Sequence, residues 1–282
     1  MTDTPLKFGC QTFTWEMLGA GWTGGADDLL QAISKGGYTG IEITDTMIGD
    51  YADRPVAFAD ALEAAGLTLV SFAFGSASGF TMPEHINADL ETAKCWVDFA
   101  ARFPGALVSM GSATVMSEGP RAGKFAVAAE IYNRASEIGR QVGVTVAVHP
   151  SSHHDTLLYT RADYDTIFAL LEPQVGWVPD TGHILRGGQV MIDTLSAHRD
   201  RICYVHLKDV DAKGNWAMLG EGVCDIAGVI SAVREAPNFN GWIVVEEESE
   251  TAAVDPAAAV RRNRETLTGL GLAGAADEGD EL

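Results

Sequence analysis

The sequence predicts an α/β fold in which one chain forms a (β/α)8 barrel of the TIM type. Eight short β-rich runs alternate with longer amphipathic helical patterns, and this alternation is typical of a parallel sheet. The chain has 282 residues, which is enough for a barrel of about 250 residues. No Gly-x-Gly-x-x-Gly segment follows the first run, and this weakens the alternative of a doubly wound open sheet.

Each predicted strand is a short run enriched in β-branched and other apolar residues. Helical patterns such as AFADALEAAG and YDTIFALLE separate these runs. Glycine or proline ends several of the helical patterns, for example Gly66, Gly143 and Pro173. The predicted strands cover residues 7–13, 40–44, 68–74, 106–111, 144–149, 175–180, 202–208 and 242–248.

The domain organisation is expected to be simple, because no Pro/Ser-rich linker divides the chain. Residues 1–272 are predicted to form the barrel. Residues 273–282 carry four carboxylates and no aromatic side chain, so we expect a disordered acidic tail. The connection at residues 211–225 is long and contains Trp216 and three glycines, and we interpret it as a lid over the catalytic end.

Composition narrows the classes of partner. The chain has 39 acidic and 19 basic residues and a net charge of −20, and such a surface repels nucleic acid and anionic membranes. The four cysteines form no Cys-x-x-Cys pair, the N-terminus has no apolar signal core, and no run approaches the roughly 18 apolar residues of a membrane helix. We expect a cytoplasmic protein with no nucleic-acid or membrane partner.

Several predicted strands end in a polar side chain that should face the barrel lumen. Side chains of a barrel strand alternate between lumen and helices. In VTVAVH this places His149 inward, and in GIEIT it places Glu42 inward. In ICYVHLK it places His206 and Lys208 inward and Cys203 outward.

The last two candidate carboxylates come from the sixth and eighth runs. Asp180 ends the run VGWVPD. In WIVVEEE the alternation is ambiguous, since either Glu246 and Glu248 or Glu247 alone can face inward. The catalytic end of such a barrel is the C-terminal end of its strands, and isolated buried charges are costly. A divalent metal ion would satisfy two histidines and two of these carboxylates at once.

Each of these side chains also has a structural interpretation. His206 alone is typical of a hydrogen-bonded core histidine, and Asp180 before Thr-Gly-His is typical of a helix cap. Glu246 stands in a run of three glutamates and would then be solvated, while His153 and His154 would be surface loop residues. The metal interpretation is favoured, because the alternative requires every one of these structural interpretations to be correct at the same time. Mixed nitrogen and oxygen ligands suit manganese first, with cobalt, zinc, magnesium or iron as alternatives.

Four segments, VAVHPSSHHDT, VGWVPDTGH, YVHLKDVD and GWIVVEEE, resemble the xylose-isomerase-like sugar isomerase/epimerase superfamily. Within it the chain looks most similar to the inosose dehydratase branch, because of the His-Pro-x-x-His segment after the fifth strand. The resemblance covers residues 7 to about 272. It implies that the metal ligands are His149, Asp180, His206 and Glu246. It also implies that His183 and Lys208 face the substrate.

The sequence departs from the superfamily at one ligand. Ketose epimerases of this group carry glutamate at the end of the fifth strand, where this chain has His149. One of the two opposed glutamates that move a proton between substrate faces is therefore missing, which puts two-glutamate epimerisation in doubt. The loss of a negative charge should also make the metal a stronger Lewis acid.

The resemblance and the site chemistry together predict proton abstraction next to a ketone. The candidate bases are Glu246, His153, His154 and Glu42, and Lys208 or His183 would protonate the leaving oxygen. The favoured outcome is β-elimination from a small, neutral keto-sugar or keto-cyclitol such as an inosose, with keto-sugar isomerisation or epimerisation as the alternative. The residues expected to act in catalysis are Glu246, His153, Lys208 and His183. The residues expected to bind substrate are Gln11, Glu42, Trp15, Phe74, His154 and Trp216.

Two further functions stay open on the same fold. An endonuclease IV-like DNA repair enzyme would need a basic surface, and the net charge of −20 disfavours it. A non-catalytic sugar-binding barrel would bind its ligand without metal. A homo-oligomer or a second subunit is compatible with the sequence.

Overall fold

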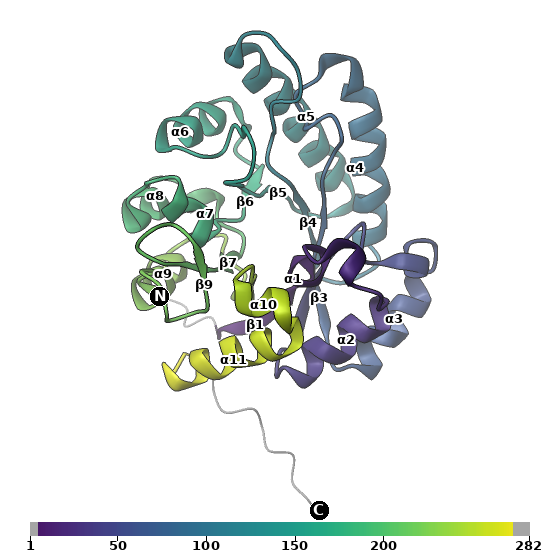
Figure 1. Ribbon diagram of the computed structural model, residues 1–282. Coiled ribbons are helices and arrows are strands. Elements are labelled where there is room, and N and C mark those ends of the chain that lie inside the picture. The colour runs from purple at the N-terminus through teal and green to yellow at the C-terminus, as the bar shows by residue number, and fades with distance from the viewer. Residues whose placement is uncertain (1–4, 273–282) are drawn as a thin grey trace, which may run out of the picture.

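Eight parallel strands form one sheet that curls into a barrel, as the sequence predicts (Figure 1). The computed structural model describes residues 5–272, and the tail predicted at residues 273–282 lies outside the described residues. The order along the sheet is β6-β5-β4-β3-β2-β1-β10-β7. The strands are β1 (Lys7–Gln11), β2 (Gly40–Thr44), β3 (Thr68–Phe74), β4 (Leu107–Met110), β5 (Val146–Val148), β6 (Gly176–Trp177), β7 (Val205–Leu207) and β10 (Trp242–Val245).

The barrel closes between β6 and β7 through single bridges. Trp177 pairs with Ile202 and Asp180 pairs with His206, both in parallel. The His206 amide donates to the Pro179 carbonyl at 2.9 Å. Pro179 has no amide hydrogen to donate, so β6 is shorter than the predicted run of residues 175–180. The second bridge places two of the predicted metal ligands side by side.

Helices surround the sheet (Figure 1). No described helix is long and apolar enough to cross a membrane. The α-helices are α1 (Phe13–Glu16), α2 (Ala26–Lys35), α3 (Pro55–Ala64), α4 (Ile86–Ala100), α5 (Arg121–Val142), α6 (Arg161–Leu170), α7 (Thr181–Arg186), α8 (Met191–Ala197), α9 (Ile226–Arg234), α10 (Glu250–Val254) and α11 (Pro256–Gly269). The 3-10 helices are η1 (Gly19–Gly21), η2 (Gly49–Asp53), η3 (Pro83–His85) and η4 (Arg199–Arg201).

Local sequence explains where several helices begin and end. Thr160 and Asp163 form a capping box that begins α6, since each side chain accepts a hydrogen bond from the other residue's backbone amide. Gly143 ends α5 with φ of 76°, a left-handed conformation that favours glycine. These signals agree with the helix ends predicted at Gly66 and Gly143.

The predicted lid is partly ordered as an antiparallel hairpin. Strands β8 (Asp209–Val210) and β9 (Trp216–Ala217) pair with each other outside the barrel sheet. The Asp209 carboxylate accepts hydrogen bonds from the amides of Gly220, Gly222 and Cys224, and so fixes the return of the loop. The hairpin carries Trp216 to the C-terminal end of the strands, where its ring lies over Lys208.

The core has two parts that follow the strand alternation. A large cluster between sheet and helices includes Val146, Val148 and Val205, as predicted. A small cluster includes the inward-facing Ala147 and Tyr204. Apolar packing thus fills the lumen, and the polar strand ends lie beyond it.

Cys203 departs from its predicted outward position. It belongs to the small inner cluster with Tyr204. A Cβ atom on Gly176 would lie 2.3 Å from the Cys203 sulfur, so the thiol occupies the space that glycine leaves. The regular strand begins only at Val205, and the period of two therefore does not extend back to Cys203.

Candidate active site

The structure brings the four predicted metal ligands together at the C-terminal end of the barrel. Asp180 precedes α7, His206 lies in β7, and His149 and Glu246 directly follow β5 and β10. One potential ligand atom from each residue lies within 4.8 Å of the other three. Nε2 of His149 is 2.9 Å from Nδ1 of His206 and 3.8 Å from Oδ2 of Asp180. Nδ1 of His206 is 2.9 Å from Oε2 of Glu246.

Asp180 supplies the clearest sign that this cluster suits a cation. Its Oδ1 accepts the His183 amide at 2.7 Å, as the cap of α7. Its Oδ2 is buried and has no hydrogen-bond partner among the described residues. Burial raises the pKa of Asp180 to about 7. A buried carboxylate oxygen beside two imidazoles and a second carboxylate is a donor set that fits a divalent metal ion.

Without a bound cation to balance the carboxylates, His206 is charged and His149 is neutral. Burial and the neighbouring His206 lower the pKa of His149 to about 3, so its lone pair is free for coordination. Burial also opposes charge on His206, but Glu42 and Glu246 outweigh it and raise the pKa of His206 to about 10. Binding of a metal through His206 would therefore release a proton.

Glu42 lies behind His206. Its Oε2 is 3.0 Å from Nε2 of His206 and accepts a hydrogen bond from the Tyr204 hydroxyl. Its Oε1 accepts from the Gln11 amide at 3.3 Å. A carboxylate on the far nitrogen of a ligating histidine fixes the ring orientation and raises the basicity of the ligand. Glu42 lines the pocket, but its oxygens are already engaged by protein donors.

The structure resolves the ambiguity in the last strand, because Glu246 and Glu248 both point inward. Lys208 Nζ donates to Glu246 Oε1 at 2.8 Å and to Glu248 Oε1. Glu247 points away and accepts hydrogen bonds from Asn263 and Ser249. Burial alone would lower the pKa of Lys208, but Glu246 and Glu248 raise it. Lys208 therefore stays charged and neutralises the two carboxylates.

His183 is held in one tautomer. The Ser152 amide donates to Nδ1 of His183 at 3.0 Å, so a neutral His183 carries its proton on Nε2. Burial and the Lys208 charge hold the pKa of His183 well below its usual value, which keeps the ring neutral. Nitrogen and oxygen atoms of His153, His183 and Glu248 also lie within 4.8 Å of one another. Nε2 of His183 carries a proton, and its Nδ1 accepts a hydrogen bond from Ser152. Neither nitrogen has a lone pair free for a metal ion, so this second group suits hydrogen bonding rather than metal coordination.

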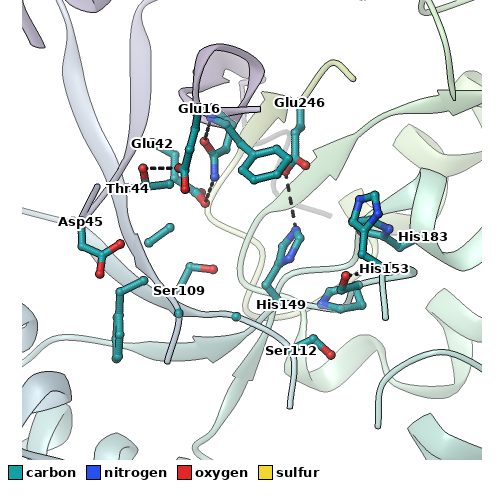
Figure 2. Close-up of a pocket in the computed structure, with 18 of the residues that line it drawn as sticks. Glu16, Glu42, Thr44, Asp45, Ser109, Ser112, His149, His153, His183 and Glu246 are labelled. Carbon is teal, nitrogen blue, oxygen red and sulfur yellow. Dashed lines mark hydrogen bonds and ion pairs between the residues drawn. The ribbon is translucent and has the colours of Figure 1, made fainter. Parts of the chain in front are cut away.

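A cavity of about 300 Å³ opens beside the ligand cluster (Figure 2). Its lining includes the predicted residues Gln11, Phe74, His153 and His183, together with His149 and Glu246. Figure 2 shows Glu16, Thr44 and Asp45 on one side of this pocket and His153 and His183 on the other. The cavity therefore joins the cluster of candidate metal ligands to a second, oxygen-rich wall.

Three residues expected to bind substrate lie outside this lining. Trp15 is buried and packs edge-on against Trp22. His154 is exposed on the loop with φ of 60°. Trp216 lies with its ring centroid 4.0 Å from Lys208 Nζ and 4.4 Å from Arg186 Cζ, so it covers a cation rather than a sugar face.

Sequence reasoning missed most of the wall opposite His153. Thr44 and Asp45 end and follow β2 two and three residues past Glu42, so the strand-end rule that selected Glu42 could have been carried further. Glu16 comes from the short helix α1, where no sequence signal marked it. Its Oε2 accepts from the Thr44 hydroxyl at 2.6 Å. Burial and the Glu16 charge raise the pKa of Asp45.

Comparison with known proteins gives a family-level match. The model of a family described as the xylose isomerase-like TIM barrel matches residues 30–270. The inosose dehydratase of Geobacillus kaustophilus is 31% identical over 143 residues, which are 44% of this chain and 46% of that protein. The chain thus spans about half the length of the curated relatives it matches.

Solved structures are similar over nearly the whole chain. The 3-keto-D-glucoside 4-epimerase from E. coli has a TM-score of 0.74 at 20% identity, covering 94% of this chain and 99% of that one. The IolI protein, solved with a bound zinc atom, has a TM-score of 0.75 at 16% identity, covering 98% of this chain and 100% of that one. At such low identity these likenesses concern the fold alone.

Proposed function

The chain belongs to the xylose isomerase-like TIM barrel family, and on that premise we propose that it is a metal-dependent dehydratase or lyase acting on a cyclic keto-sugar or inosose. The enzyme would remove the proton next to the ketone and eliminate the β-oxygen as water or alkoxide. The observation that carries the proposal is the cluster of His149, Asp180, His206 and Glu246 with the unpartnered Asp180 Oδ2. The inosose dehydratase relatives support this substrate class.

The four clustered residues would hold one divalent ion, with manganese as our first expectation. When bound, such an ion supplies a Lewis acid for the ketone oxygen. His149 and His206 would give nitrogen ligands, and Asp180 and Glu246 would give oxygen ligands. Zinc is a strong alternative, because the fold neighbour IolI was solved with zinc.

His153 is the best placed of the candidate bases. In the metal-bound state Glu246 would give one oxygen to the ion while its Oε1 accepts from Lys208, and Glu42 is engaged by three protein donors. His154 does not line the pocket, whereas the half-buried His153 ring does. His153 would therefore take the α-proton and become an imidazolium.

His183 and Lys208 would stabilise the negative charge that develops on substrate oxygen. The Nε2–H of neutral His183 is a fixed donor close to His153, and fixed donors are effective where charge develops in the transition state. As the carbon–oxygen bond breaks, the leaving hydroxide would take the proton from the His153 imidazolium and depart as water. Lys208 is buried and paired with two glutamates, so it would act by its charge rather than as the acid.

The pocket favours an uncharged substrate. No lysine or arginine is among the described residues that line it, while Glu16 and Asp45 add carboxylates. A phosphate group would meet negative charge on that wall with no cation to bind it. Polyol hydroxyls, in contrast, can donate to these carboxylates and to the serine and threonine oxygens of the lining.

The same pocket supports epimerisation as the second candidate. Asp45 and Glu16 face His153 across the cavity, and a second base on the opposite face of the substrate is what epimerisation requires (Figure 2). In this alternative the proton would leave to one wall and return from the other. The carbon skeleton and all oxygens would be retained.

One experiment separates the two candidates. Manganese-loaded enzyme is incubated in D2O with 2-keto-myo-inositol and, separately, with a 3-keto-glucoside. We expect a product lighter by one water or one alcohol, with new ultraviolet absorption from an unsaturated ketone. An isomer that differs only by deuterium would assign the epimerase, and no reaction with either compound in the metal-loaded enzyme would contradict both.

A further inference from the structure

Glu248 links His153, the proposed base, to Lys208 and Glu246. It lies two residues beyond Glu246 and its side chain is 7% exposed. Its Oε2 is 3.0 Å from Nε2 of His153. Its Oε1 accepts from Lys208 Nζ, which also holds Glu246. A continuous chain of polar contacts therefore runs from Glu246, a predicted metal ligand, through Lys208 and Glu248 to His153.

This contact selects one nitrogen of His153. The Glu248 carboxylate accepts at both oxygens, so the His153 ring must donate from Nε2. A neutral His153 then keeps its lone pair on Nδ1, and that nitrogen is the one free to take a proton. The titratable groups around the ring are Glu248, His183 and, beyond Glu248, Lys208.

The contact also anchors a side chain that lies outside the regular strands. His153 lies on the irregular segment after β5, and its side chain is 37% exposed. Its backbone amide donates to the Ser151 hydroxyl, and its ring meets His183 edge-on and Trp216 at a tilt. Glu248 is the one carboxylate among the described residues that is hydrogen-bonded to this ring. Trp216 in turn lies over Lys208, the second hydrogen-bond partner of Glu248.

We propose that Glu248 is the positioning residue of the proton-transfer step, holding His153 with Nδ1 free and stabilising the imidazolium that forms when it takes the α-proton. This inference rests on the proposed function for its catalytic meaning. Its structural content, a carboxylate-bound Nε2–H on His153, does not depend on any turnover. The two can therefore fail separately.

The first test is nuclear magnetic resonance of resting protein labelled with 15N-histidine, with a His153→Gln variant to assign the resonance. We expect a downfield, exchange-protected Nε2–H signal for His153. Glu248→Ala should abolish that signal, and Glu248→Gln should move it upfield, since a neutral amide oxygen accepts more weakly than a carboxylate. Glu250→Gln is the matched control, because it removes the same charge from an exposed position two residues away and should leave the signal unchanged.

The second test is kinetic. Glu248→Gln should lower kcat by about 10²- to 10⁴-fold with little change in KM, as expected when a general base loses its orienting carboxylate. Metal content and thermal unfolding midpoint should match those of Glu250→Gln, which separates positioning from a structural role. A His153 Nε2–H signal that persists in Glu248→Ala, or full kcat in Glu248→Gln, would overturn the inference. If the wild type shows the expected signals but no turnover, the proposed function is contradicted, whereas the contact between Glu248 and His153 is supported.

Discussion

The site has two halves that are held in different ways. The strand-borne half consists of the four candidate metal ligands at the rim of the barrel, and the loop-borne half consists of His153, Asp45 and Trp216. Asp180, His206 and Glu246 are almost fully buried and are fixed by barrel pairing and by the closing bridge between β6 and β7. His153 and Asp45 are partly exposed and are held by side-chain and loop contacts. If the proposed function holds, metal binding is built into the barrel, whereas substrate choice depends on loops that can vary without disturbing the fold.

The largest expected effect on metal affinity comes from a substitution in the strand-borne half. His149→Ala should weaken metal binding by at least about 10²-fold, above the 10- to 100-fold typical of losing an outer partner of a ligand. His149→Glu should retain the ion, because a carboxylate can replace the imidazole. Metal content by mass spectrometry measures this, with the exposed His85→Ala as control. Equal occupancy in His149→Ala and His85→Ala would show that the end of β5 supplies no ligand.

Acidification should weaken metal binding by the strand-borne half. Without the ion, the pKa of His206 is raised to about 10 and that of Asp180 to about 7, so both groups must lose protons for the ion to bind. Metal affinity should therefore fall as pH falls, by about tenfold per unit from His206 alone and more steeply below pH 7. Titration calorimetry in buffers of different ionisation enthalpy should find about one proton released at pH 8 and nearly two at pH 6. A release of zero protons at both pH values would contradict these pKa shifts.

A smaller loss of metal affinity should follow from substitution of Glu42, which contacts the proposed ligand His206 and not the ion itself. Glu42→Gln should weaken metal binding by about 10- to 100-fold, because it removes the charge that orients and polarises His206. A competition titration with a chelating dye measures the affinity. If the affinity stays constant while KM rises, Glu42 belongs to substrate binding instead.

The smallest of these effects should come from Trp216, in the loop-borne half. Trp216→Ala removes the ring over Lys208, a cation–π contact worth about 1 to 2 kcal/mol when desolvated, and should lower kcat by about 5- to 30-fold. Trp216→Phe should retain most of the activity. Metal content should equal that of wild type in both variants. Loss of metal in Trp216→Ala would mean that the two halves are not independent.

The same division explains what the sequence could predict. The strand-borne ligands follow from the period of two, which is strict wherever one face of a strand packs on helices, as at Val146 and Val148. Glu42 was found by the same rule, although the sequence could not tell that its oxygens would be used by His206 and Tyr204. Cys203 was misplaced because it precedes the regular strand.

The loop-borne residues were harder to predict because their positions depend on contacts distant in sequence. Trp216 lies in the expected lid, but the hairpin directs its ring over Lys208, where Gly182 leaves room; a Cβ there would lie 2.6 Å from Trp216 Cζ3. Glu16 enters the pocket from a one-turn helix that has no amphipathic pattern. The sequence left open whether Glu248 or Glu247 faces inward. Only the path of the chain after β10 decides this, and it points Glu248 toward Lys208 and Glu247 toward Asn263.

The central claim is that His149, Asp180, His206 and Glu246 hold one catalytic divalent ion. The most direct measurement is turnover of 2-keto-myo-inositol by protein stripped with a chelator and then reloaded, with metal counted per chain in the same samples. We expect negligible turnover in the stripped protein and recovery in proportion to manganese bound, reaching full activity at one ion per chain. Full turnover in protein shown to contain no metal would contradict the account.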